Sequence, residues 1–133
     1  MEFVHADLTE DEGWERATDG SEYVLHVASP FPAVIPQDEN ELIIPAREGT
    51  LRVLQAALAS GVKRVVLTSS AAAVWEGHTD YDKIYDESDW SNMEGKIDPY
   101  PKSKTIAEQA AWDFIRNQDS EFPMELSAIN PGF

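Results

Sequence analysis

The chain has 133 residues, with 10 basic and 25 acidic side chains and a formal net charge of −15. This length suits one domain with a core of its own, and the 42% of hydrophobic residues excludes a wholly disordered chain. The negative charge argues against nucleic acid and anionic membranes as partners, and the lack of cysteine excludes disulfides and thiolate sites.

Strand-like and helical patterns alternate along the first third of the chain. Residues 2–7 alternate weakly in hydrophobicity, like the end of a strand, and Thr9 is the expected N-cap of a short helix over 9–18. The run 23–28 is continuously apolar, which is typical of a strand buried on both faces of a parallel sheet. Three prolines within 29–36 then predict a loop.

The rest of the chain continues this alternation. Helical spacing over 38–60 precedes the most apolar strand of the sequence, 62–70, which again has the pattern of burial on both faces. A long polar stretch over 71–97 predicts a loop, before a helix over 98–117 and a strand over 124–129. Because strands and helices alternate, we expect an α/β fold whose parallel sheet binds ligands beyond the carboxyl ends of its strands.

Tyr100 and Lys104 begin the helix expected over 98–117. They are one helical turn apart and share the face whose later residues are apolar. An ammonium close to a phenol favours the phenolate form, and a phenol tuned this way can exchange a proton near neutral pH. The same spacing fits a solvated helix start with a packed tyrosine. Ser69 and Ser70 end the most apolar strand, where a hydroxyl can bind a substrate carbonyl or cap a turn.

A serine pair at the end of a strand, followed by a tyrosine and a lysine four residues apart on a helix, is a specific pattern. With it, the chain resembles the extended short-chain dehydrogenase/reductase family of the NAD-dependent epimerase/dehydratase superfamily, in its dihydroflavonol-4-reductase-like branch. The matching segments are 3–8, 26–30, 48–54, 63–70, 85–90, 100–108 and 130–132. The Tyr-Asp-Glu-Ser-Asp-Trp sequence of one segment narrows the resemblance to this branch rather than to sugar epimerases. The resemblance implies a Rossmann-like parallel sheet with flanking helices.

The same resemblance implies an NAD(P)(H)-dependent oxidoreductase that interconverts the carbonyl and alcohol forms of a small molecule. Tyr100 would protonate the carbonyl oxygen as hydride arrives, and Lys104 would assist it and hydrogen-bond the nicotinamide ribose. Ser70 would hold and polarise the carbonyl, with Ser69 as the weaker candidate. By the branch it resembles, the chain would use NADP(H) more readily than NAD(H).

Further positions correspond to the cofactor site of the family. Asp7 and Leu8 match the pair that meets the adenine, and Pro131 matches the residue near the nicotinamide. The backbone stretch beside the cofactor corresponds to Val27, Ala28 and Ser29.

The sequence lacks the family's glycine-rich G-x-x-G-x-x-G turn, which holds the cofactor pyrophosphate. Because the first βαβ unit and the C-terminal substrate region are also missing, residues 1–133 are expected to form a partial Rossmann-like domain of a truncated, weakly active or inactive enzyme. A non-catalytic binding or regulatory module on the same scaffold is the alternative. The missing strands predict a rearranged sheet, or an open edge on 23–28 that a preceding segment or a second copy covers.

Other signals are weaker. The three histidines have no ligand spacing, so we expect no metal, and His26 fits a hydrogen-bonded core histidine. The N-terminus has no signal-peptide pattern, and no apolar run approaches the ~20 residues that span a bilayer. We therefore expect a cytoplasmic protein.

Overall fold

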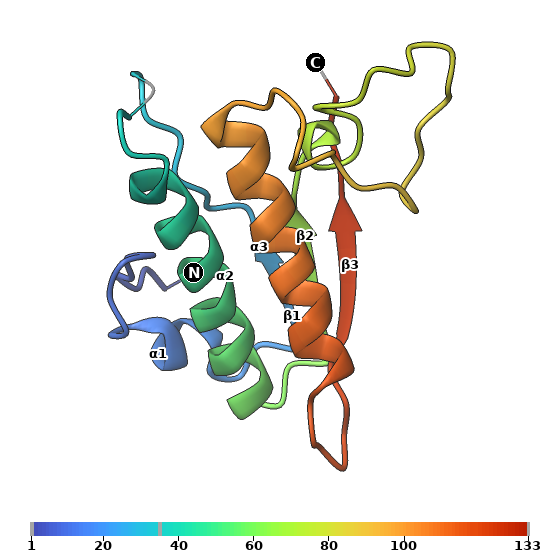
Figure 1. Cartoon of the computed structure of the whole chain (residues 1–133). Coiled ribbons are helices and arrows are strands. Elements are labelled where there is room, and N and C mark those ends of the chain that lie inside the picture. The colour runs from blue at the N-terminus through green and yellow to red at the C-terminus, as the bar shows by residue number, and fades with distance from the viewer. Residues whose placement is uncertain (1, 35, 133) are drawn as a thin grey trace.

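Three of the apolar segments pair side by side in a parallel sheet. They are β1 (Tyr23–His26), β2 (Arg64–Thr68) and β3 (Glu125–Ile129), in the order β1-β2-β3. The computed structural model that shows this sheet describes residues 2–34 and 36–132 (Figure 1). The predicted strands at 23–28, 62–70 and 124–129, and their parallel arrangement, are therefore confirmed.

Two long helices, α2 (Asn40–Ala59) and α3 (Pro99–Arg116), pack together across one face of the sheet (Figure 1). Pro99 explains where α3 starts, because proline fits the first helical position, whose N–H has no partner within the helix. The buried core lies between these helices and the sheet. It comprises Leu54, Ala57, Val62, Val65, Leu67, Ala111 and Met124.

The other face of the sheet is uncovered by the described residues, which corrects the expectation of strands buried on both faces. Side chains alternate along a strand, so Val24 and Val65 face the helices while Leu25 and Val27 face away. Leu25 is 72% exposed and Val27 is 65% exposed. The apolar pattern indicated hydrophobic side chains on both faces. It could not show that α2 and α3 lie on the same face.

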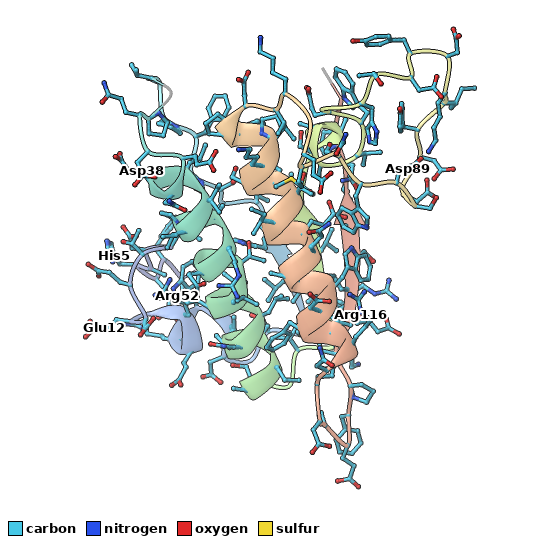
Figure 2. The ribbon with its side chains drawn as sticks, in the orientation of Figure 1. His5, Glu12, Asp38, Arg52, Asp89 and Arg116 are labelled. Atoms are coloured by element: carbon cyan, nitrogen blue, oxygen red, sulfur yellow. The ribbon has the colours of Figure 1, made fainter. Side chains whose placement is uncertain are left out.

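Residues 2–7 do not form a strand, contrary to the sequence prediction. A strand needs a hydrogen-bonded neighbour, and β1 pairs only with β2 among the described strands. The segment is instead held on α2, where Leu8 packs over Gly49 and the Arg52 Nη1 donates to the Leu8 carbonyl at 2.9 Å. Arg52 also pairs with Asp11, and Figure 2 shows Arg52 between α2 and the N-terminal segment.

The first helix is shorter than the expected 9–18: α1 spans Trp14–Thr18. Thr9 does not cap it, because its N–H and hydroxyl both donate to the Asp7 carboxylate, at 2.8 and 2.6 Å. This local turn competes with the capping box. Gly13 precedes the helix with a φ of 89° and lies against the His5 carbonyl, where a Cβ would come within 2.2 Å.

The long segment between β2 and α3 is mostly irregular, as predicted, and includes one short 3-10 helix, η1 (Ala71–Ala73). Ser91 ties the segment back to η1, because its hydroxyl donates to the Ala72 carbonyl at 2.8 Å and accepts from the Glu76 N–H. Figure 2 shows Asp89 in this segment, on the opposite side of the molecule from His5. No helix within 2–34 or 36–132 is both long and apolar enough to cross a bilayer.

Candidate active site

The carboxyl ends of β2 and β3 meet at the end of the sheet where α3 begins (Figure 1). Backbone hydrogen bonds continue past the strands, from Ser69 N–H to the Ile129 carbonyl at 2.8 Å and from Ala71 N–H to the Pro131 carbonyl at 3.0 Å. These bonds bring the serine pair after β2 beside the Asn-Pro turn after β3. The structure thus gathers polar residues at the predicted edge.

Lys104 reaches this edge from α3. Its side chain is buried, with 7% of the residue exposed, and its Nζ donates to the Thr68 carbonyl at 3.3 Å. The same Nζ lies 5.8 Å from the centre of the Tyr100 ring, so the helical spacing does bring the amine and the phenol ring together. Burial lowers the pKa of Lys104, and the negative charge of Glu108 partly opposes this effect.

Tyr100 is half-buried at the first turn of α3. Its ring packs edge-on against Phe31, with 5.2 Å between ring centres. The two rings line an apolar hollow of about 310 Å³ with Pro32, Leu42 and Pro101 among its walls. The proline-rich loop after β1 therefore provides one side of the space around the tyrosine.

The two serines have different surroundings, although both are buried. The Ser70 hydroxyl accepts a hydrogen bond from the Ala72 N–H at 3.1 Å and so caps η1. The Ser69 hydroxyl has no hydrogen-bond partner within the described part of the chain. Both the capping interpretation and the substrate-binding interpretation of this pair stay chemically open, because a capped Ser70 still has its own hydrogen to donate.

Two of the predicted cofactor residues lie next to Lys104. Ala28 and Ser29 line a small cavity whose walls also include Ser69, Lys104 and Glu108. The volume of about 10 Å³ leaves room for roughly one water molecule. The third residue of that stretch, Val27, exposes its side chain on the uncovered face of the sheet.

The predicted adenine pair lies elsewhere. Asp7 is exposed, and its hydrogen bonds from Thr9 lower the pKa of its carboxyl group. Leu8 packs on Gly49 of α2. Their contacts are thus with α1, α2 and their own turn, whereas the Pro131 carbonyl accepts from the Ala71 N–H at the strand ends.

Two buried polar groups beside the site were not assigned to it from the sequence. Glu108 follows Lys104 by one helical turn, and its carboxylate accepts a hydrogen bond from Asn130. In the sequence, the four-residue spacing from Lys104 was the only indication that Glu108 lies near the site. The prediction that His26 is a hydrogen-bonded core histidine is wrong. Its Nε2 has no partner among residues 2–34 and 36–132, and burial with the nearby Lys104 charge lowers the pKa of His26 to about 4.

Comparison with known proteins adds relatives along nearly the whole chain. Residues 1–117 match the model of the 3-beta hydroxysteroid dehydrogenase/isomerase family. An anthocyanidin reductase of Vitis vinifera is 39% identical over 140 residues, covering 99% of this chain and 41% of that protein. A dihydroflavonol 4-reductase of Arabidopsis thaliana is 39% identical over 125 residues, covering 88% of this chain and 32% of that protein.

A solved structure is also similar. Gre2 of Candida albicans in complex with NADPH matches 96% of this chain and 41% of its own length, with a TM-score of 0.78 and 34% identity. This match confirms the predicted Rossmann-like fold class. The chain spans less than half the length of each of these three proteins.

Proposed function

Because the chain belongs to the 3-beta hydroxysteroid dehydrogenase/isomerase family, we propose that it carries the catalytic residues of an NADP(H)-dependent reductase that interconverts carbonyl and alcohol groups. The predicted resemblance to the epimerase/dehydratase superfamily and its dihydroflavonol-reductase-like branch is confirmed by the family match and the reductase relatives. The observation that carries the proposal is the buried Lys104 ammonium, which bonds the end of β2 and lies against the Tyr100 ring.

When bound, a nicotinamide would supply the hydride. In the proposed chemistry, Tyr100 donates a proton to the carbonyl oxygen of the substrate. Lys104 stabilises the negative charge that remains on the phenol oxygen, since a buried ammonium acts strongly in a low-dielectric site. Ser70 donates its hydroxyl hydrogen to the same carbonyl oxygen. This use is compatible with its cap of η1, where its oxygen only accepts.

We propose that the residues near Lys104 hold the nicotinamide end of the cofactor. Ala28 and Ser29 form a wall beside Lys104, which supports their proposed place along the ribose and ring. Asp7 and Leu8 would meet the adenine at the opposite end. NADP(H) is proposed over NAD(H), supported by the NADPH complex of the similar Candida albicans protein.

The sequence has no glycine-rich turn for the pyrophosphate, so we propose that the 133-residue chain binds the cofactor weakly and turns over slowly or not at all. Charge-assisted hydrogen bonds contribute about 1.5–3 kcal/mol each, so the loss of each one weakens binding by about 10–150-fold. A fluorescence titration with NADPH measures this directly. Saturable binding at micromolar concentration would contradict weak binding.

The chemistry is tested in a chimera in which residues 1–133 replace the matched stretch of the Candida albicans reductase. We expect NADPH-dependent reduction of a dihydroflavonol or a small ketone. Tyr100→Phe should lower kcat by about 10²–10⁴-fold while NADPH still binds. Unchanged turnover of this variant removes Tyr100 from the mechanism, and a chimera that binds NADPH but reduces no carbonyl contradicts the proposed function.

A non-catalytic binding module is the second candidate. The observation that favours it is the use of the Ser70 hydroxyl as a cap, which a purely structural serine also shows. In that case the chimera would bind NADPH but reduce no carbonyl, and Tyr100→Phe and Ser70→Ala would have no activity to remove. A loss of activity with both substitutions favours the reductase.

For the open edge expected on 23–28, and for the uncovered face of the sheet, we propose that the remainder of a full-length reductase is the occupant. The relatives have more than half of their length outside the matched stretch, and a second copy would bring together two chains of charge −15. Size-exclusion chromatography of the isolated chain separates the two occupants, because a stable, monodisperse dimer points to a second copy. The cytoplasmic location stays a prediction, which cell fractionation tests.

A further inference from the structure

Glu108 is a buried carboxylate to which the proposed chemistry gives no task. Only 6% of the residue is exposed. A buried charge is costly unless it is hydrogen-bonded, and two donors from different elements serve this one. Trp112 Nε1 donates to Oε1 at 3.2 Å, and Asn130 Nδ2 donates to Oε2 at 2.8 Å.

Asn130 extends this contact to the predicted catalytic serine. The same Nδ2 donates to the Ser70 carbonyl at 3.1 Å, so the two hydrogens of the amide serve acceptors on α3 and after β2. Both partners are acceptors, which fixes the orientation of the amide. A continuous set of contacts therefore runs from Glu108 through Asn130 to the backbone of Ser70.

Glu108 also acts on Lys104, with which it lines the small cavity at the strand ends. Within the described residues, the titratable groups that face Lys104 are His26 from β1 and Tyr100 and Glu108 from α3. Glu108 supplies the negative charge that opposes the effect of burial on the pKa of Lys104. Without this charge, the buried amine would lose its proton more readily.

We propose that Glu108 is a positioning residue, which fixes Ser70 through Asn130 and places a carboxylate beside the Lys104 side chain. The catalytic meaning of these two tasks rests on the proposed function. The contacts themselves belong to this chain and are measurable without cofactor. They join three elements at the one point where the proposed chemistry takes place.

The test uses NMR on the 133-residue chain with Glu108→Gln and Glu108→Ala. Glutamine keeps an oxygen that can accept from Asn130 but removes the charge, so the titration midpoint of the Lys104 side chain should fall while the Asn130 amide signals stay near their wild-type positions. Alanine removes the acceptor as well, so the Asn130 signals should move and the Ala72 N–H should exchange faster. The matched control is Asp113→Asn, which removes an exposed carboxylate from the same helix and should change neither readout.

Two results overturn the proposal: an unchanged Lys104 midpoint in Glu108→Gln, or unmoved Asn130 signals in Glu108→Ala. If the alanine variant does not fold, Asn130→Ser removes the same donor, and unchanged exchange of the Ala72 N–H then overturns the Ser70 part. NADPH binding and carbonyl reduction by the chimera are scored separately. A failure of the NADPH measurements contradicts the reductase function, whereas the proposal for Glu108 is judged only by the NMR results.

Discussion

The two faces of the sheet differ in what they contact, although both are apolar. On one face, Val65 and Leu67 are buried against α2 and α3. On the other face, Leu25 and Val27 are mostly exposed. Lys104 and Glu108 reach the strand ends from α3, on the covered side. The site geometry thus depends on the face that α2 and α3 cover. The opposite face is free to contact another polypeptide segment.

The largest difference between the faces is expected for leucine truncation. Leu54 lies in the core of the covered face and is 1% exposed, so Leu54→Ala should lower the free energy of unfolding by about 2–5 kcal/mol. The matched control is Leu25→Ala on the uncovered face, which should change it by less than about 0.5 kcal/mol. Urea unfolding of both variants measures the contrast. Equal losses would show that Leu25 is buried in solution.

A second difference depends on pH, because His26 faces the covered side. Its pKa is lowered to about 4, so between pH 6.5 and 4 the unfolded chain takes up a proton that the folded chain does not. Stability should therefore fall as the pH drops through this window, by about 3 kcal/mol at most. His26→Gln should flatten the curve of unfolding free energy against pH, and His5→Gln, on the exposed N-terminal segment, should not. A wild-type curve that is flat between pH 6.5 and 4 would contradict this.

The same comparison explains which parts of the fold the sequence predicted. The helical periods over 38–60 and 98–117 and the apolar strand runs are local patterns, and each formed the expected element. The strand expected at 2–7 failed because a strand also needs a partner. The expected burial on both faces failed because it depends on which elements cover the sheet.

Within the site, the same limit applies. The pairing of Tyr100 with Lys104 follows from four-residue helical spacing and could be predicted. The contact of Glu108 with Asn130 joins residues 22 positions apart on different elements, and no local pattern indicates it. The missing partner of the His26 Nε2 could not be predicted either. The sequence indicates that a strand is buried, but not which hydrogen-bond partners one ring nitrogen has.

A smaller effect is expected where the N-terminal segment rests on α2. A Cβ on Gly49 would come within 2.7 Å of the Leu8 side chain, which would have to move. Gly49→Ala should therefore loosen residues 2–11, while the free energy of unfolding should change by less than about 1 kcal/mol, because the helix propensity of alanine offsets the overpacking. Limited proteolysis should cut this segment faster. Gly61→Ala is the control, because it adds a methyl group in open space, although the φ of 72° at Gly61 adds backbone strain. Faster cutting of residues 2–11 only in Gly61→Ala would contradict the contact between Gly49 and Leu8.

The smallest effect on stability is expected for a charge on the uncovered face. Leu25→Lys places an ammonium among Tyr23 and Val27, where exposed apolar side chains otherwise meet water. Nothing packed is lost, so the free energy of unfolding should change by less than about 0.5 kcal/mol, while binding of a hydrophobic dye should fall because the apolar patch is interrupted. Lysine on this edge strand also opposes strand pairing with other chains. A loss of stability that grows with protein concentration would instead show that two copies bury this face against each other, and the proposed occupant would then be wrong.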